Sequence, residues 1–389
     1  MRVATKLFRE FFQSEKSGGL VLIICTAASL LIANFIGGQD YANWWHQKAG
    51  FSLGPINLHL SIEHWINDGL MTIFFLLIGL EIERELYVGE LSSLRNATLP
   101  LAAAAGGMAV PAMIHFLFNN GTATAGGFGI PMATDIAFAL GILSLAGNRV
   151  PLGLKVFLTA LAIIDDLGAI LIIAFFYSKG IQFNYLLMAG GIFVLLLVLN
   201  RLKVHRLWPY LLGGILMWYG MLQSGVHATI SGVLLAFAIP FGDGKEKSPS
   251  YRLQHFLHIP VAFFIVPFFA LANTGILISG SVSDMLNNRN SWGIMAGLLL
   301  GKPIGILTCC FLAIQLKVAR LPEAVNWKQL SGAAVLAGIG FTMSIFIALL
   351  AFDKPELILQ SKVAILAASV LAGAIGFVLV KWSVRSVVK

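Results

Sequence analysis

The chain has 389 residues, of which 58% are hydrophobic and only 11% are charged. Soluble globular proteins average about 45–50% apolar and about 25% charged residues, so this composition excludes a soluble fold of comparable size and predicts an integral membrane protein. The net charge of +8 does not indicate a nucleic-acid partner, because the Lys and Arg residues stand at the ends of apolar segments and form no dense basic run. The apolar residues come in long blocks, which favours spanning helices over the alternating strands of a β-barrel.

Residues 1–16 precede the first long apolar block. Their apolar side chains fall on one helical face, which is typical of an amphipathic helix lying on the membrane surface. From 17–389 we predict a single all-α, polytopic domain, because a spanning helix needs about 20 apolar residues and the sequence offers twelve such blocks. The loop 45–60 alternates apolar and polar residues, which predicts a β-hairpin outside the cytoplasm. The expected spans are 18–36, 64–85, 98–118, 125–147, 153–177, 182–200, 207–222, 226–240, 257–277, 292–314, 329–352 and 359–381.

The distribution of Lys and Arg gives the twelve spans an expected orientation. With the N-terminus in the cytoplasm, 20 of the 26 Lys and Arg residues fall at inner ends and inner loops. Basic residues concentrate on the cytoplasmic side of membrane proteins. We therefore expect a multi-pass protein whose N- and C-termini are both cytoplasmic.

Spans 4 and 11 are interrupted by helix-breaking residues. Residues 126–135 contain three glycines and Pro131 before Thr134, and residues 338–344 contain two glycines before Thr342. Interrupted spans in corresponding positions of two halves are the best sequence indication of a transporter's binding site. Spans 3–5 and 10–12 are therefore expected to form an inverted-topology repeat. The alternative is that the glycines only allow close helix packing.

Ionisable residues in the middle of spans are costly and are functional candidates by default. Asp165 and Asp166 are adjacent in span 5, and two buried carboxylates cannot both ionise cheaply without a cation or an ammonium group nearby. Such a pair can hold protons or a small hard cation, and competition between the two is antiport in its simplest form. Lys302 in span 10 is the expected counter-ion. At the break in span 4, the carboxylate of Asp135 can offset the partial positive charge of half-helix N-termini, although Asp135 could equally be a simple helix cap. Thr134 can add an oxygen ligand for the cation.

A second group of ionisable residues lies at inner helix ends or alone in a span. Glu81, Arg84 and Glu85 either form an ion-paired helix end or take part in regulation. Histidine changes charge nearest to cytoplasmic pH, so we also single out three of them: His227, His255 and His258.

Taken together, these motifs resemble the NhaA family of sodium/proton antiporters. The resemblance covers nearly the whole chain. It is carried by Trp65-Ile66-Asn67-Asp68, Gly79-Leu80-Glu81, Arg84-Glu85-Leu86, Ala133-Thr134-Asp135, Ile163-Ile164-Asp165-Asp166-Leu167-Gly168-Ala169, Ser224-Gly225-Val226-His227-Ala228-Thr229, Gly301-Lys302-Pro303 and Gly338-Ile339-Gly340-Phe341-Thr342-Met343-Ser344.

The resemblance implies twelve helices with spans 4 and 11 unwound where they cross, and a homodimer in a bacterial inner membrane joined partly by the 45–60 hairpin. It implies export of Na⁺ or Li⁺ in exchange for H⁺, electrogenic and activated at alkaline pH. Asp165 and Asp166 would carry cation and protons, with Asp166 the principal Na⁺ ligand. Lys302 would pair with Asp165 or balance half-helix C-termini, while Asp135 balances the N-termini.

The resemblance further assigns pH regulation to Glu81, Arg84, Glu85, His227, His255 and His258. Two positions depart from the best-studied member, because Gln254 replaces a glutamate and Glu83 replaces a lysine. Both departures concern the pH response and leave the transport residues unchanged.

Three functions other than antiport also place charged residues within a membrane. A sodium-coupled symporter of similar inverted-repeat fold is the nearest. An ion channel fits the broken spans less well. An intramembrane aspartyl protease would take its two aspartates from different helices, so we expect no enzyme. The glycines before Lys302 lack the spacing and the Ser or Thr of a phosphate loop, so we expect no nucleotide and no cofactor. The expected partners are Na⁺, Li⁺, H⁺, membrane lipid and a second copy of the chain.

Overall fold

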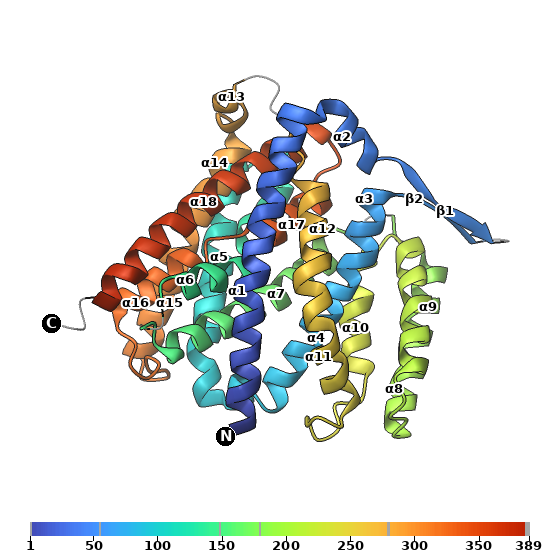
Figure 1. Ribbon diagram of the computed structural model, residues 1–389, viewed down its shortest axis with the longest axis horizontal. Helices are drawn as coiled ribbons and strands as arrows, with labels where there is room; N and C mark the ends of the chain where they lie inside the picture. The colour runs from blue at the N-terminus through green and yellow to red at the C-terminus, as the bar shows by residue number, and fades with distance from the viewer. Residues whose placement is uncertain (1, 54–55, 148, 179, 278–280, 386–389) are drawn as a thin grey trace. The chain divides into compact units, whose positions relative to one another are not determined.

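The computed structural model describes residues 2–53, 56–147, 149–178, 180–277 and 281–385 (Figure 1). The secondary structure of these residues is helical, apart from one two-stranded hairpin, and loops connect the helices. Nine helices in the described ranges are long and apolar enough to cross a membrane. A tenth is added if the bent pair α16 (Trp327–Leu336) and α17 (Phe341–Ala351) counts as one span.

Two of the twelve expected spans are short in the structure. The segments 207–222 and 226–240 correspond to α9 (Trp208–Ser224) and α10 (Ile230–Ala238), with 17 and 9 residues. Neither reaches the roughly 20 residues of a typical spanning helix, so the count of twelve stays a prediction. At the other end of the chain, α1 runs without a break over Arg2–Leu31, which joins the expected surface segment and the first span into one helix.

The chain folds into two compact units, and each is discontinuous in sequence. Unit 1 comprises Met1–Val21, Gly89–Ala169 and Ile278–Lys389, and unit 2 comprises Leu22–Val88 and Ile170–Leu277. Helices α1 and α7 (Leu152–Phe176) contribute to both. Unit 1 further contains α5 (Leu94–Asn119), the 3-10 helices η3 (Glu90–Ser92) and η4 (Ala125–Met132), α6 (Ile136–Leu145), α13 (Val282–Leu286), α14 (Arg289–Ala296), the π-helical turn Gly297–Gly301, α15 (Lys302–Gln315), α16, α17 and α18 (Pro355–Arg385).

Unit 2 begins within α1 and ends in the loop that follows α12. Besides α9 and α10, its elements are the π-helical turn Ile32–Ile36, α2 (Gly38–Trp45), β1 (Lys48–Leu53), β2 (Ile56–Ser61), α3 (Ile62–His64), the π-helical turn Trp65–Leu70, α4 (Met71–Tyr87), α8 (Phe183–Arg201), α11 (Pro249–Pro260), the π-helical turn Val261–Ile265 and α12 (Val266–Asn273).

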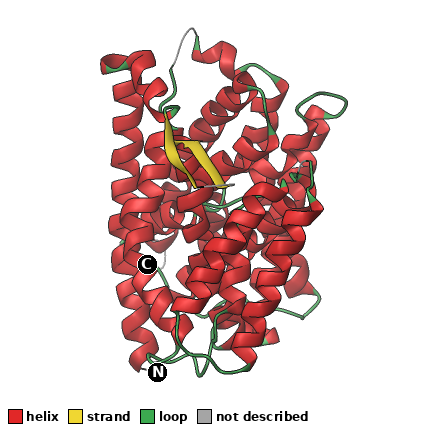
Figure 2. Ribbon diagram, turned by 90° about the vertical axis from the view of Figure 1, so that its right-hand side faces the viewer, coloured by secondary structure: helices red, strands yellow, loops and turns green. Residues whose placement is uncertain are grey.

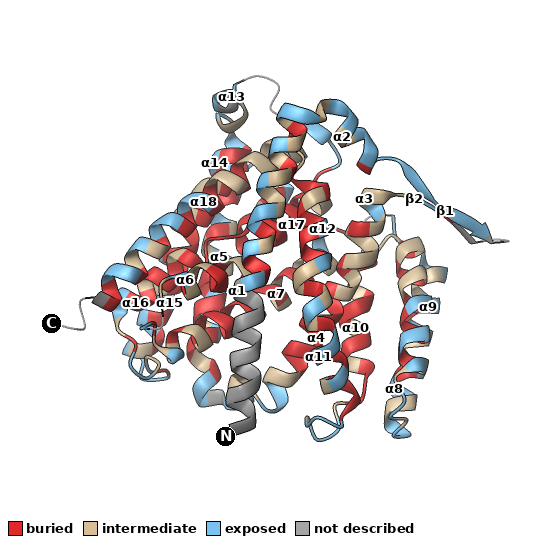
Figure 3. Cartoon of the chain, viewed as in Figure 1, coloured by how far each residue is buried: buried red, intermediate tan, exposed pale blue. Residues whose placement is uncertain are grey.

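Within unit 2, burial separates two kinds of helix (Figure 3). Helix α4 is buried along most of its length and packs against α10, where Gly79 lies against Val233 and Ala236. Helix α8 packs beside α9 (Figure 1) and leaves half of its apolar side chains exposed, with only Ala189 and Leu196 buried. An exposed face of this composition is suited to lipid rather than to water.

The segment 45–60 contains the only strands among the described residues (Figure 2). β1 and β2 pair antiparallel, with Lys48 opposite Ser61 and Leu53 opposite Ile56. The expected turn at Gly54-Pro55 lies outside the described residues. A Cβ at Gly50 would overlap the carbonyl group of Leu58, so glycine is required where the two strands meet there.

Within unit 1, α5 packs closely along α15. A Cβ on Gly106 would overlap the carbonyl oxygen of Gly305, and a Cβ on Gly305 would overlap the carbonyl oxygen of Gly106. Further along, Gly107 lies against Ile306 and the side-chain stem of Lys302. Small residues let the backbones of spanning helices approach, and this approach brings Lys302 into the interior of unit 1.

Candidate ion-binding site

The break in span 4 separates η4 from α6. Glycines and Pro131 disfavour a regular α-helix, and Ala125–Met132 accordingly forms a 3-10 helix. Ala133 is extended (φ −75°, ψ 152°), and Asp135 (φ −82°, ψ 98°) then begins α6 as its N-cap. The carboxylate oxygen Oδ1 of Asp135 accepts a hydrogen bond of 2.9 Å from the amide of Phe138.

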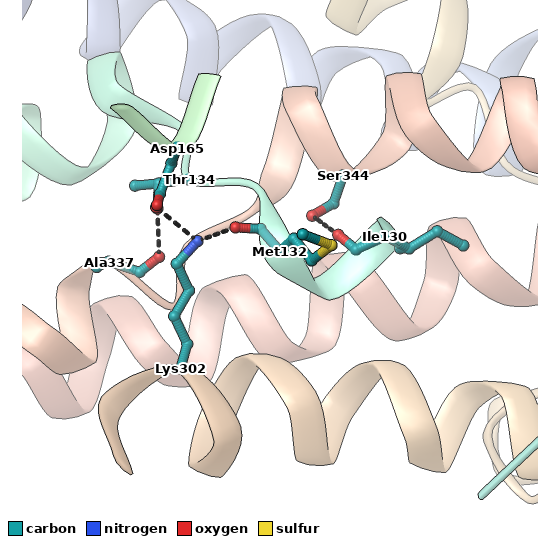
Figure 4. A network of polar contacts seen from close by, with 7 residues as sticks. All are labelled: Ile130, Met132, Thr134, Asp165, Lys302, Ala337 and Ser344. Carbon is teal, nitrogen blue, oxygen red and sulfur yellow. Dashed lines mark hydrogen bonds and ion pairs between the residues drawn. The ribbon is translucent and has the colours of Figure 1, made fainter. Parts of the chain in front are cut away.

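The break in span 11 meets the break in span 4. Helices α16 and α17 are bent by 44° at residues 337–340. The backbone N–H of Asp135 donates to the carbonyl of Ile339 at 2.7 Å. The hydroxyl of Ser344 donates to the carbonyl of Ile130 at 2.7 Å (Figure 4). The two interrupted segments are therefore held together by hydrogen bonds that an unbroken helix would have used internally.

The carboxylate of Asp135 lies at the N-termini of both α6 and α17, the two half-helices that follow the breaks. Oδ2 of Asp135 accepts from the amide of Thr342 at 3.1 Å and from its hydroxyl, while Oδ1 caps α6. Helix N-termini carry partial positive charge, and an anion there is stabilising. Asp135 is only 2% exposed, so water contributes little to offsetting these charges. Asp135 is therefore a helix cap in the structure, and its charge-compensating role stays a prediction.

The proposed counter-ion pair lies beside this crossing (Figure 4). Nζ of Lys302 is 2.9 Å from Oδ2 of Asp165, and both side chains are fully buried. Nζ also donates to the carbonyl of Met132, the last residue of η4. The resemblance offered pairing with Asp165 and balancing a half-helix C-terminus as alternatives, and in the structure Lys302 makes both contacts.

Thr134 contributes a hydroxyl to the same carboxylate. Its Oγ1 lies 2.7 Å from Oδ2 of Asp165 and 3.0 Å from the carbonyl of Ala337, the C-cap of α16. A single hydroxyl proton has both acceptors within reach. The other oxygen of Asp165, Oδ1, is buried and accepts no hydrogen bond from the part of the chain that is described. Asp166 follows directly and is fully buried.

The arrangement can hold a small cation. Carboxylate, hydroxyl and carbonyl oxygens are the ligands that hard cations take in proteins. Asp165, Asp166 and Thr134 supply such oxygens, and the Asp135 carboxylate adds negative charge at the neighbouring N-termini. No ionised group other than Lys302 donates to Asp165 among the contacts described. A cation can approach Asp165 through Oδ1, while Oδ2 is in contact with Lys302.

The six residues assigned to pH regulation lie in unit 2, whereas the five transport residues lie in unit 1. On α4, Glu81 is buried and Arg84 and Glu85 are half-buried. His255 is exposed on α11 and stacks on Tyr251, and His258 is half-buried. His227 lies in the turn between α9 and α10, with Nε2 3.0 Å from the carbonyl of Tyr177.

The sequence analysis missed several partners of the site. Thr342 was noted only as part of a break, yet it donates twice to Asp135. Ser369, on α18, accepts from the first amide of α17, that of Phe341, and was not singled out. The carbonyls of Met132 and Ala337 could not be found from residue types at all. The repeated threonine after each break was the one signal available.

The fold and the buried charges together indicate a class of protein: a multi-pass helical membrane protein with ionisable side chains at interruptions of its apolar helices, an arrangement typical of secondary transporters. A family model described as Na⁺/H⁺ antiporter 1 matches residues 9–380. The chain belongs to this family, and the resemblance found in the sequence is confirmed.

Several relatives are similar over their full length. The Na(+)/H(+) antiporter NhaA of Flavobacterium psychrophilum is 57% identical, with 99% of this chain and 98% of the relative covered. That of Dechloromonas aromatica is 58% identical (96% and 95% covered), and that of Citrobacter koseri 47% identical (96% and 97% covered). Among solved structures, the sodium proton antiporter MjNhaP1 of Methanocaldococcus jannaschii matches with a TM-score of 0.53 at 13% identity, covering 98% of this chain and 99% of that one. This last likeness shows the fold alone.

Proposed function

We propose that the protein is a secondary antiporter that exports cytoplasmic Na⁺ or Li⁺ in exchange for H⁺ by alternating access. The chain belongs to a sodium/proton antiporter family. The observation that carries the proposal is the fully buried Asp165–Lys302 ion pair beside Asp166, at the meeting point of two interrupted helices. Buried charges persist only where they are paired or neutralised, so a cation and protons compete for these carboxylates.

Charge balance supports an electrogenic exchange. With Asp166 protonated and the Asp165–Lys302 pair intact, the three groups carry no net charge. When Na⁺ binds between the two ionised carboxylates and displaces Lys302, burial favours loss of the lysine proton as well. The site then carries a net charge of −1, and two protons have left for one Na⁺. The return step with two protons is neutral, so each cycle moves one positive charge inward.

Asp166 is assigned as the principal cation ligand, and Thr134 as an additional oxygen ligand. Asp165 forms its ion pair through Oδ2 and keeps Oδ1 for the cation. Asp135 accepts hydrogen bonds from the N-termini of both half-helices and supplies the negative charge between them. It need not contact the cation. Li⁺ should be carried as well, since the proposed ligands are hard oxygen atoms.

The test is transport by the purified protein in liposomes loaded with a pH-sensitive dye. Adding Na⁺ or Li⁺ outside should move protons in the opposite direction, and an imposed membrane potential should change the rate. Proton movement that needs an organic substrate along with Na⁺ would instead identify a sodium-coupled symporter. Absence of cation-dependent proton movement in well-folded protein would refute the proposal.

We further propose twelve membrane-crossing helices, in which α9 and α10 cross despite their length and each broken span counts once. The bias of Lys and Arg supports cytoplasmic N- and C-termini, and the bacterial relatives support the inner membrane. The β1–β2 hairpin, with Phe51 53% exposed, is proposed to join two copies into a homodimer. Surface labelling of single cysteines introduced into 45–61 and near residue 385 tests the topology, and cross-linking through the hairpin tests the dimer.

Activation at alkaline pH completes the proposal. Protons occupy the carboxylates of Asp165 and Asp166 at low pH and leave no site for Na⁺. We propose that six residues of unit 2 modify the dependence of antiport on pH: Glu81, Arg84, Glu85, His227, His255 and His258. The antiport activity in turn contributes to pH homeostasis of the cell.

A further inference from the structure

A second buried polar network lies in unit 1, at the last turn of α5. His115 and Asn119, one helical turn apart, have no exposed surface. Neither belongs to the transport site described above. Burying an imidazole and an amide is costly unless each forms hydrogen bonds, so their partners indicate what they do.

The hydrogen bonds of Asn290, on α14, assign the tautomer of His115. Nδ2 of Asn290 donates to the hydroxyl of Ser361 on α18 at 2.8 Å. Its Oδ1 therefore faces Nε2 of His115, 3.1 Å away, as an acceptor. Nδ2 of Asn119 also lies 3.4 Å from Nε2, but its two N–H groups are donated to the carbonyls of His115 and Arg289. Nε2 therefore carries the proton, and Nδ1 is an unprotonated nitrogen with no hydrogen-bond partner in the described chain. Among the described residues no carboxylate hydrogen-bonds the ring, so the imidazole acts here as a neutral donor.

Asn119 connects the same helix to the start of η4. Its Oδ1 accepts from the hydroxyl of Thr124, the N-cap of η4, at 2.7 Å. Its Nδ2 donates to the carbonyl of His115 at 2.9 Å and to that of Arg289 at 3.3 Å. Thr122 adds a hydroxyl contact of 2.8 Å with Thr124. The amide of Asn119 thus ties together the end of α5, the start of η4 and the start of α14.

Two glycines let the neighbouring backbones reach the imidazole. A Cβ on Gly127, in η4, would lie 3.1 Å from Cε1 of His115. A Cβ on Gly293, in α14, would lie 3.0 Å from Cδ2 of His115 and 2.6 Å from Nδ2 of Asn119. The ring therefore sits in contact with η4 on one side and α14 on the other.

We propose that His115 and Asn119 are positioning residues for the transport site, acting through η4. The hydrogen bonds within a 3-10 helix have poorer geometry than those of an α-helix, so contacts at the two ends of η4 contribute to its placement, besides that of Ser344 with Ile130. One end is held by this network at Thr124, and the other presents the carbonyl of Met132 to Lys302 and leads into Thr134. The inference rests on the proposed function, because it assigns a means of positioning the site that this function requires.

The experiment measures Na⁺-dependent antiport, ²²Na⁺ binding in detergent and thermal stability for three variants and one matched control. His115→Leu removes the donor, His115→Gln keeps a neutral N–H near the place of Nε2, and Thr124→Val removes the hydroxyl link to η4. Ser291→Ala is the control: Ser291 is also buried on α14, next to Asn290, but its hydroxyl bonds the carbonyl of Met285.

We expect His115→Leu and Thr124→Val to raise the apparent KM for Na⁺ and the Kd for ²²Na⁺ by about threefold to tenfold, the usual range for coupling within one network. His115→Gln should stay within twofold of the parent, as should Ser291→Ala even if its Tm falls. Unchanged KM and Kd in both His115→Leu and Thr124→Val would overturn the inference, as would an equal increase in Ser291→Ala. A parent protein without cation-dependent proton movement would instead refute the proposed function.

Discussion

The two carboxylate oxygens of Asp165 differ in their contacts, because both donors, Lys302 and Thr134, contact Oδ2. Oδ2 lies 2.9 Å from Nζ of Lys302 and 2.7 Å from the hydroxyl of Thr134, while Oδ1 accepts no hydrogen bond from the described chain. A cation can approach Oδ1 first and displace Lys302 afterwards. Binding and proton release are then consecutive events at one carboxylate.

Asp165→Asn and Asp166→Asn should each abolish exchange in folded protein. An amide is nearly isosteric with a carboxylate, but it neither takes up a proton nor carries the charge that holds a cation. Dye-based antiport in proteoliposomes measures the loss, and Asp40→Asn, at an exposed position, is the matched control. Near-normal turnover of either variant at saturating Na⁺ would exclude the carboxylate-pair mechanism.

Lys302→Ala should destabilise the protein as well as impair transport. Removing one partner of a buried ion pair leaves an uncompensated charge and costs about 3–5 kcal/mol. The Tm in detergent should fall clearly below that of Lys354→Ala, in which the lysine is exposed. An unchanged Tm would mean that the pair does not contribute to the resting state.

At the scale of the element, the two breaks depend on each other. Half-helix α6 is capped by Asp135, and the same side chain accepts from Thr342 at the start of α17. Each half-helix alone would have an uncompensated N-terminus inside the membrane region. The structure therefore places one anion where two partial positive charges meet.

Asp135→Ala should disturb both half-helices, whereas Thr342→Val should disturb one. Loss of an N-cap side chain costs about 0.5–2 kcal/mol, and the alanine variant removes two sets of contacts and a charge. Asp135→Asn keeps one of the two accepting oxygens and loses the other together with the charge, so its Tm should lie between that of Asp135→Ala and the parent. Measured Tm values out of this order would contradict the shared-cap interpretation.

Gly305→Ala should impair folding and transport because the added methyl group meets the backbone of Gly106 and not a flexible side chain. Helices α5 and α15 would have to separate, and Lys302 would move with α15. The matched control is Gly190→Ala on α8, where a Cβ meets nothing within 4 Å. The control should be neutral or slightly stabilising, since alanine favours helix more than glycine. Equal yield and activity of the two variants would contradict the packing argument.

The helix interruptions and the buried position of the carboxylates could be predicted from sequence, because glycine, proline and charged residues within apolar segments leave signals in residue type. What joins them could not. The hydrogen bond from Asp135 to Ile339 and the contact of Lys302 with Met132 use backbone carbonyls, which every residue possesses. The short helices α9 and α10 were also predicted only as apolar blocks, because hydropathy does not show where the helical hydrogen bonding ends.

At the scale of the whole molecule, transport and regulation are assigned to different units. All five transport residues lie in unit 1 and all six regulatory candidates lie in unit 2. Competition between protons and Na⁺ requires only the former. Part of the pH response should therefore survive changes confined to unit 2.

We expect an alkaline-activated profile that persists in His255→Gln/His258→Gln, shifted by less than about one pH unit, which is the scale of a single nearby charge in contact with water. Simple competition lowers apparent Na⁺ affinity smoothly as pH falls and preserves the maximal rate. Kinetics from about pH 6.5, the unperturbed pKa of histidine, to about pH 9 separate the two effects. A maximal rate that collapses below neutral pH in the parent and recovers in the double variant would demonstrate a histidine sensor.

The contact between Gly106 and Gly305 also limits how the sequence can change over evolutionary time. Most packed side chains can exchange volume, since a larger residue on one helix is tolerated if its neighbour becomes smaller. Here both contacting residues are already glycine, so neither can be replaced by a smaller residue. Suppressors of Gly305→Ala should therefore arise at an adjoining position that can still become smaller, such as Val110, whose Cβ is 3.0 Å from the added methyl group, and none should arise at residue 106.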